Sequence, residues 1–133
     1  MLDIMSRKER SKRMSLIKSK WTRPERLVHN YLKGYKIKHI MHSKINGSAD
    51  IIIPSKKIAI FIHGCFWHGC KTCYQKPVNN RKFWVNKIKK NIQRDERNVR
   101  LSKKNGWKVK IVWECEIPRR DPEESLRKLM RNL

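Results

Sequence analysis

The chain has 133 residues, and its 34 Lys and Arg against 11 Asp and Glu give a formal net charge of +23 at pH 7. With 38% hydrophobic residues, a single domain over residues 1–133 is expected, which excludes a wholly disordered basic tail. So strong a charge predicts a polyanionic partner, nucleic acid first and a membrane surface second, and its self-repulsion favours a monomer. No stretch approaches the roughly 18 apolar residues of a membrane span, and no apolar secretion signal is present, so we expect a cytoplasmic protein.

Basic residues dominate the start of the chain. Residues 1–20, and above all residues 6–20 (SRKERSKRMSLIKSK), predict an arm or short helix that docks on a nucleic-acid backbone. Residues 22–25 (TRPE) fit a capping box, in which Thr22 is the N-cap and Glu25 reaches back to the N-cap amide. This pattern predicts a helix from Thr22 to about Leu32.

Three strand-like segments come next. Residues 36–42 (KIKHIMH) and 49–53 (ADIII) are typical of strands, and Asn46-Gly47 between them is a hairpin turn signal. Residues 58–62 (IAIFI) form a continuous apolar run, which predicts a strand buried on both faces. The residues that directly follow this strand should lie at one edge of a sheet.

A long helix is predicted over residues 80–105, closed by Asn105-Gly106 as its C-cap. Its apolar stripe consists of Ile88, Ile92 and Val99. Asp95 lies on the same stripe, so its carboxylate should face inward, where it needs a hydrogen bond or a nearby positive charge.

The last two elements are a strand and a short helix. Residues 107–115 (WKVKIVWEC) predict the strand, with Trp107 and Trp113 in the core, and residues 121–132 predict the helix. The order α, β-β-β, α, β, α indicates a mixed α/β fold.

All four cysteines belong to one predicted cluster. Three of them lie within nine residues, and the fourth ends the last strand; they are Cys65, Cys70, Cys73 and Cys115. Four thiolates in a reducing compartment favour a closed, structural Zn²⁺ site over disulfides. Two alternatives stay open: four unrelated buried thiols, or a site in which His68 replaces one cysteine as ligand.

The scarce carboxylates mark a second candidate site. Asp50 is the only carboxylate between Glu25 and Asp95, although a lone Asp is also explained as a cap or turn residue. His63 and His68 lie on the loop after the buried strand. An Asp that holds Mg²⁺ and a His that moves a proton form a set suited to metal-assisted hydrolysis.

The residues quoted above carry a resemblance to a known family. The run HGCFWHGC at residues 63–70, together with the motifs that follow it, closely resembles the very short patch repair (Vsr) endonucleases over about residues 6–117. Those motifs are Cys73, Phe83-Trp84, Asn91, Arg94-Asp95, Gly106-Trp107 and Trp113-Glu114-Cys115.

The resemblance implies a restriction-endonuclease-like fold of the PD-(D/E)xK superfamily, with a mixed central sheet flanked by helices and a structural zinc. The implied activity is a Mg²⁺-dependent nick in double-stranded DNA on the 5′ side of the thymine in a T:G mismatch. Such mismatches arise when 5-methylcytosine deaminates, so a DNA cytosine methyltransferase is the implied genetic neighbour. Accessory mismatch-repair proteins are candidate partners, and the basic arm at residues 1–20 would dock on the DNA.

The resemblance also implies roles for individual residues around the metal. Asp50 matches the Mg²⁺-binding Asp, and the main-chain carbonyl of Ile62 matches a second ligand, at a position where characterised relatives have Thr. His68 matches the base that activates water, His63 a histidine at the scissile phosphate, and Asp95 the partner that orients a catalytic His.

Further matches lie around this centre. Glu25 matches an acidic residue near the metal waters, and the capping box competes with that explanation. The aromatic residues Phe66, Trp67 and Trp84 match a wedge that intercalates beside the mismatch, and the four cysteines match the zinc ligands. The rival hypothesis is a non-catalytic zinc-stabilised DNA-binding module, which leaves Asp50 and both histidines without a task.

Overall fold

A computed structural model of the chain describes residues 21–44, 48–65, 67–72 and 78–131. The predicted docking arm, the Asn46-Gly47 turn, Phe66 and Cys73 therefore lie outside the described residues. In the described part, the elements follow the predicted order of helix, three strands, helix, strand and helix. They are α2 (Arg23–Gly34), β1 (Ile40–Met41), β2 (Ile51–Ile53), β3 (Ile58–His63), α3 (Arg81–Lys104), β4 (Lys108–Trp113) and α4 (Pro122–Leu129).

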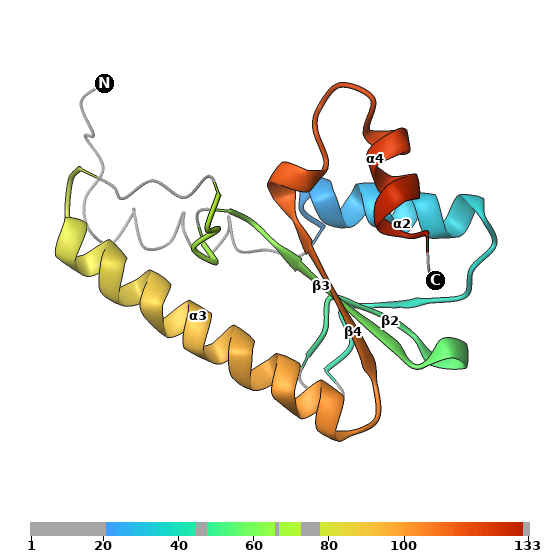
Figure 1. The fold of residues 1–133 in the computed structure, drawn as a ribbon, viewed down its shortest axis with the longest axis horizontal. Coiled ribbons are helices and arrows are strands. Elements are labelled where there is room, and N and C mark those ends of the chain that lie inside the picture. The colour runs from blue at the N-terminus through green and yellow to red at the C-terminus, as the bar shows by residue number, and fades with distance from the viewer. Residues whose placement is uncertain (1–20, 45–47, 66, 73–77, 132–133) are drawn as a thin grey trace.

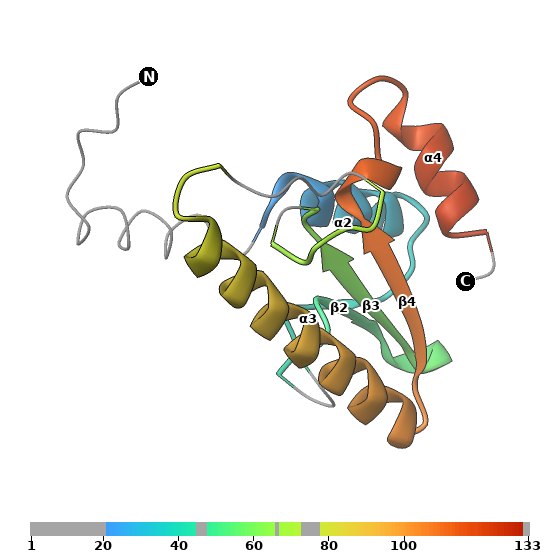
Figure 2. The same cartoon turned by 60° about the vertical axis from the view of Figure 1, so that its left-hand side comes forward.

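The four strands form one mixed sheet in the order β1-β2-β3-β4. Strand β2 is antiparallel to both of its neighbours, β1 and β3. Strands β3 and β4 run parallel, from the pair Ile58↔Lys108 to the pair His63↔Trp113. Figure 1 shows α2 and α4 together on one side of the sheet and the long α3 on the other, and Figure 2 shows α3 alongside β3 and β4. The expected α/β architecture with a mixed sheet is confirmed.

Strand β3 divides the core into two halves. Its six residues are all buried, as the apolar run predicts. Ile58, Ile60 and Ile62 pack toward α2 and α4, while Ala59 and Phe61 pack toward α3. Because side chains alternate along a strand, His63 follows Phe61 onto the α3 face. The alternation thus delivers His63 to the side of the sheet that α3 covers.

The first two strands are shorter than predicted. Only Ile40–Met41 of the predicted 36–42 strand and Ile51–Ile53 of the 49–53 strand are paired. Lys36 and His42 adopt left-handed backbone conformations with φ of 57° and 53°, and Ser48 has φ 57°. An extended strand does not pass through such conformations, so the paired segments are confined between these residues.

The last predicted strand also ends early, and one of its tryptophans lies elsewhere than expected. Residues 114–116 form a 3₁₀ turn, so β4 ends at Trp113. Both tryptophans are half-buried, but only Trp107 packs on the α3 half of the core, whereas the Trp113 ring meets that of His63 edge-on at 4.9 Å. The core assignment of Trp113 is wrong because the residue shares the α3 face with Val109 at the end of the strand where a pocket opens. None of the described helices is long and apolar enough to cross a membrane.

Candidate active site

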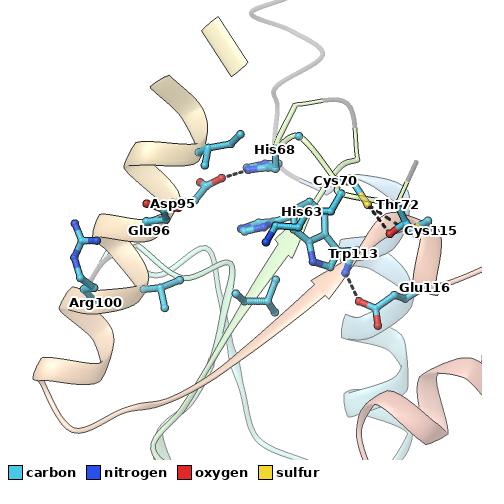
Figure 3. Close-up of a pocket in the computed structure, with 15 residues that line it drawn as sticks. His63, His68, Cys70, Thr72, Asp95, Glu96, Arg100, Trp113, Cys115 and Glu116 are labelled. Atoms are coloured by element: carbon cyan, nitrogen blue, oxygen red, sulfur yellow. Dashed lines mark hydrogen bonds and ion pairs between the residues drawn. The ribbon is translucent and has the colours of Figure 1, made fainter. Parts of the chain in front are cut away.

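One cleft of about 840 Å³ gathers residues from α2, the segment before β2, β3, the loop after β3 and α3. A second pocket of about 790 Å³ shares His63, His68 and Asp95 with this cleft and continues to the thiols (Figure 3). The predicted site residues that line the cleft are Glu25, Asp50, Ile62, His63, Trp67, His68 and Asp95.

His68 and Asp95 form a directly bonded pair. Asp95 Oδ2 lies 2.5 Å from His68 Nδ1, and both side chains are mostly shielded from solvent (Figure 3). Because a carboxylate only accepts, His68 Nδ1–H donates this bond, which leaves the Nε2 lone pair of the neutral ring available. The inward position of Asp95 on the apolar stripe of α3 thus has its partner.

The loop that carries His68 is fixed to α3 by a second contact. Asn91, buried on α3, donates from Nδ2 to the main-chain oxygen of Trp67 at 2.9 Å. Gly69 adopts a φ of +61°, and a Cβ there would lie 2.8 Å from Ile92 Cδ1. The loop therefore lies directly on the helix, and a glycine is required at the point of closest approach.

His63 stacks against His68 with ring centroids 4.2 Å apart and an interplanar angle of 6°. The residue is 4% exposed, and within the described part of the chain neither of its ring nitrogens has a hydrogen-bond partner. Burial first, and then the neighbouring His68, lower the pKa of His63 to about 4, although Asp95 opposes the shift. His63 is therefore neutral at physiological pH and faces the cleft.

Asp50 lines the same cleft as these histidines and directly precedes β2. Its Oδ2 accepts a 2.6 Å hydrogen bond from the main-chain N–H of Ile62. The pKa of Asp50 is raised to about 6, mainly by burial and also by the Glu25 carboxylate, although the Ile62 N–H, His68 and His42 oppose the rise. The contact with Ile62 shows that Asp50 is more than a turn or cap residue.

Glu25 does not close the predicted capping box. Thr22 is the N-cap of α2, but Glu25 Oε2 accepts from the main-chain N–H of Trp21 at 2.9 Å, one residue before the cap. The same oxygen lies 2.6 Å from His42 Nε2. The Glu25 carboxylate thus bonds to the Trp21 N–H and to His42 and not to the Thr22 N–H, so the predicted bond to the N-cap amide is wrong.

Three of the four cysteines converge beside the two stacked histidines. The ligand atoms of Cys65, Cys70 and Cys115 all lie within 4.8 Å of one another, and the Cys70 and Cys115 sulfurs are 3.8 Å apart. With zinc–sulfur bonds of about 2.3 Å, tetrahedral geometry places two sulfurs about 3.8 Å apart. The three thiols therefore fit a tetrahedral metal site. His68 belongs to a separate group with His63 and Asp95, which argues against its being a thiol-site ligand.

Three aromatic residues form a small cluster at the start of α3, namely Trp67, Phe83 and Trp84. The rings of Trp67 and Trp84 meet edge-on with centroids 5.8 Å apart, and Phe83 meets Trp84 at 5.1 Å. Phe83 is 57% exposed, whereas both tryptophans are partly buried. The structure thus brings together two of the three predicted wedge residues.

Comparison with known proteins identifies the family. A family model described as DNA mismatch endonuclease Vsr matches residues 2–75 of this chain. The chain belongs to the Vsr family. The DNA mismatch endonuclease Vsr of Escherichia coli is 34% identical to it over 124 residues, which cover 91% of this chain and 79% of the relative. The resemblance noted in the sequence is confirmed, and membership of this family supports nuclease activity.

Other relatives of the same family are named as nicking enzymes. The Type II nicking enzyme V.XorIIP of Xanthomonas oryzae is 38% identical over 120 residues, covering 88% of each chain. The Type II nicking enzyme V.NmeAIP of Neisseria meningitidis is 38% identical over 138 aligned positions, covering 100% of this chain and 97% of the relative.

Sequence reasoning gives no role in the site to three of its residues. Asn91 is part of the family motif, but no role is predicted for it, and Trp113 is assigned to the core. For His42, no local sequence motif indicates a function. The hairpin signal contains the information for His42, because Met41 pairs with Ile51, so His42 comes next to Asp50. Its N–H indeed donates to the Asp50 main-chain oxygen at 2.7 Å.

Proposed function

We propose that this protein is a DNA endonuclease that nicks double-stranded DNA on the 5′ side of the thymine in a T:G mismatch, in very short patch repair of deaminated 5-methylcytosine. The observation that carries the proposal is the bonded His68–Asp95 pair, which lines the same cleft as Asp50 and Glu25 in a Vsr-family chain. Relatives named as a mismatch endonuclease and as nicking enzymes support the reaction.

The donor set around Asp50 fits a hard dication such as Mg²⁺. Asp50 is a desolvated carboxylate with a second carboxylate, Glu25, close enough to raise its pKa. Buried like charges are unfavourable unless a cation neutralises them, and Mg²⁺ prefers carboxylate and carbonyl oxygens. Asp50 and the main-chain carbonyl of Ile62 would bind it, with Glu25 near its waters. Bound there, Mg²⁺ supplies stabilisation of the charge that develops on the phosphate.

The histidines supply the proton chemistry. His68 Nε2, oriented by the bond from Nδ1–H to Asp95, takes the proton of the attacking water as general base. His63 is neutral and buried against His68, and its single ring N–H donates to the scissile phosphate. The two imidazoles therefore divide the work, one accepting a proton and the other holding the substrate.

The thiol cluster is assigned to a structural Zn²⁺ in a restriction-endonuclease-like fold. Cys65, Cys70 and Cys115 supply three ligands, and Cys73 is the proposed fourth. A closed shell of four thiolates leaves no open position for substrate, so the ion's task is to hold the catalytic loop.

The remaining surfaces are assigned to DNA binding. Phe66, Trp67 and Trp84 form the wedge that intercalates beside the mismatch, where stacking is worth about 1–3 kcal/mol per base. The basic arm at residues 1–20 neutralises the DNA backbone. We further propose that residues 1–133 act as a single, monomeric domain in the cytoplasm, with accessory mismatch-repair proteins as partners.

A nicking assay tests the proposed function. Wild-type protein with Mg²⁺ should nick a T:G duplex and leave the matched T:A duplex intact, whereas Asp50→Ala should be inactive while still binding DNA. An Asp121→Ala variant, changed at an exposed carboxylate before α4, is the matched control and should keep full activity.

The rival DNA-binding module gives a different result in the same assay. Wild-type protein that binds the T:G duplex but never cuts it, with any flanking sequence, would contradict the proposal. Varying the flanks also identifies the recognition sequence.

A further inference from the structure

His63, His68 and Asp95 form a compact set of metal-binding groups apart from the thiols. One ligand atom of each residue lies within 4.8 Å of the others, and β3, the following loop and α3 each contribute one group (Figure 3). Two imidazoles and one carboxylate are a ligand set that first-row transition metals accept readily. This set differs in chemistry both from the thiol cluster and from the carboxylate and carbonyl oxygens around Asp50.

His63 is the member of this set that most needs a ligand. Its two ring nitrogens are buried, and no described residue forms a hydrogen bond with either. A buried polar group without a partner is unfavourable by about 1–3 kcal/mol, so these nitrogens are available to any suitable group that enters the cleft. His63 and His68 both line this cleft, and a ligand nitrogen of each lies within 4.8 Å of the other.

We propose that His63, His68 and Asp95 form a second, inhibitory site for a transition-metal dication such as Zn²⁺ or Ni²⁺. The inference rests on the proposed function, because it uses the same histidines. A nitrogen lone pair given to a metal no longer accepts a proton from water, and Asp95 bound to a metal no longer orients His68. Excess Zn²⁺ therefore stops nicking, although the cysteine site also uses Zn²⁺.

Mg²⁺ should not compete well for this site. Mg²⁺ requires near-octahedral oxygen coordination and gives up its waters reluctantly, whereas imidazole suits Zn²⁺ and Ni²⁺. Millimolar Mg²⁺ thus supports the reaction at Asp50 while micromolar Zn²⁺ opposes it. The same cleft then responds in opposite ways to the two ions.

The test is a titration of DNA-free protein that already carries its resident zinc. Isothermal titration with Ni²⁺ should show one further equivalent, and Co²⁺ in the same protein should give imidazole-type absorption without new thiolate charge-transfer bands. Asp95→Asn and His63→Gln should each weaken this binding by at least about 100-fold, since each removes a ligand.

His39→Gln is the matched control. His39 lies 2.8 Å from His29 in the other close histidine pair and does not line the cleft, so this variant should bind the further ion as wild type does. Thermal melts of both site variants verify folding. Asp95→Asn is less prone to unfold the protein, because other residues of α3 pack the helix in place. Nicking by wild type should fall as Ni²⁺ or Zn²⁺ is added at constant Mg²⁺.

Two results of the titration would overturn the inference. One is that no further ion binds at tens of micromolar, and the other is that binding persists in both site variants. New thiolate bands with Co²⁺ would place the ion at the cysteines and also overturn it. Failure of the proposed function is distinct, because a wild-type protein that binds Ni²⁺ as described but never nicks with Mg²⁺ alone contradicts only the nuclease.

Discussion

Asp50, the proposed Mg²⁺ ligand, is a desolvated carboxylate whose charge opposes folding. Its carboxylate loses solvent on folding and lies near Glu25, which together raise its pKa to about 6. Between about pH 4 and pH 6 the folded state retains a proton that the unfolded state has lost, so stability falls as the pH rises through this window. Above pH 6 the whole unfavourable contribution is present, up to about 3 kcal/mol for a shift of about two units.

We therefore expect Asp50→Asn to be more stable than wild type in buffer without Mg²⁺ at pH 7.5. Asn retains an oxygen that can accept from the Ile62 N–H, but it bears no charge. The gain should be up to about 3 kcal/mol and should vanish near pH 4, as denaturant melts across this range will show. Added Mg²⁺ should stabilise wild type only.

Equal stability of the two proteins at pH 7.5 would mean that the Asp50 carboxylate is well solvated. Asp121→Asn removes an exposed carboxylate and serves as the control, with an expected change within about 0.5 kcal/mol.

Residue types alone do not reveal every neighbour in the site. Asp95 can be flagged because a carboxylate on an apolar stripe needs a partner, and that partner is His68. The Glu25–His42 contact cannot be read in the same way, because the local capping signal points to Thr22. The tertiary fold places His42 within hydrogen-bond distance of Glu25, and this long-range contact replaces the local one. The local sequence pattern does not encode that contact.

At the scale of elements, long periodic segments are predicted best. The helix predicted over residues 80–105 is α3 with boundaries one residue inside, and the buried run is β3. The two short strands differ from prediction at their ends, because left-handed residues such as Lys36 and His42 carry no side-chain signature. The position of the loop after β3 depends on its packing against α3, which local sequence does not determine.

Gly69 is the contact point between that loop and α3. In Gly69→Ala, the new Cβ would lie 2.8 Å from Ile92 and 3.1 Å from Ile88 at a positive φ. We expect a loss of about 1–3 kcal/mol in stability and weaker nicking, because the loop must move away and separate His68 from Asp95. Thermal melts and single-turnover nicking measure the two effects.

Gly34→Ala is the matched control at the end of α2. A Cβ there meets nothing within 4 Å, so stability should stay within about 1 kcal/mol of wild type. If Gly69→Ala melted and nicked like wild type, the loop would not rest on the helix as described.

The thiol cluster predicts a loss of folding when one ligand is removed. In Cys115→Ser, the zinc content and the melting temperature should fall, and the residual folded fraction should lose less activity than stability. Elemental analysis and melting curves provide the measurement. Wild-type protein with clearly less than about one zinc per chain would contradict the structural zinc.

For the whole molecule, the charge of +23 makes DNA binding dependent on salt. Neutralising one Lys or Arg that binds a phosphate should reduce the slope of log K against log salt by about 1. Arg97 lines the cleft on α3, whereas Arg127 lies on α4, on the other side of the sheet, beside Glu124.

Arg97→Gln should therefore lower the salt slope by about one, and Arg127→Gln should leave it unchanged. Fluorescence anisotropy at several salt concentrations provides the slopes. Equal slopes for both variants would show that the DNA does not follow the α3 side of the cleft.

The parallel pairing of β3 with β4 also determines when the candidate active site can assemble during synthesis. His63 pairs with Trp113, and the thiols on the β3 side meet Cys115 just after β4, 45 residues beyond Cys70. On the ribosome, a nascent chain that has emerged only as far as α3 has neither the β4 strand beside His63 nor the Cys115 sulfur. Cutting ability should therefore arise only once β4 has emerged, which protects the genome from unfinished copies of the protein.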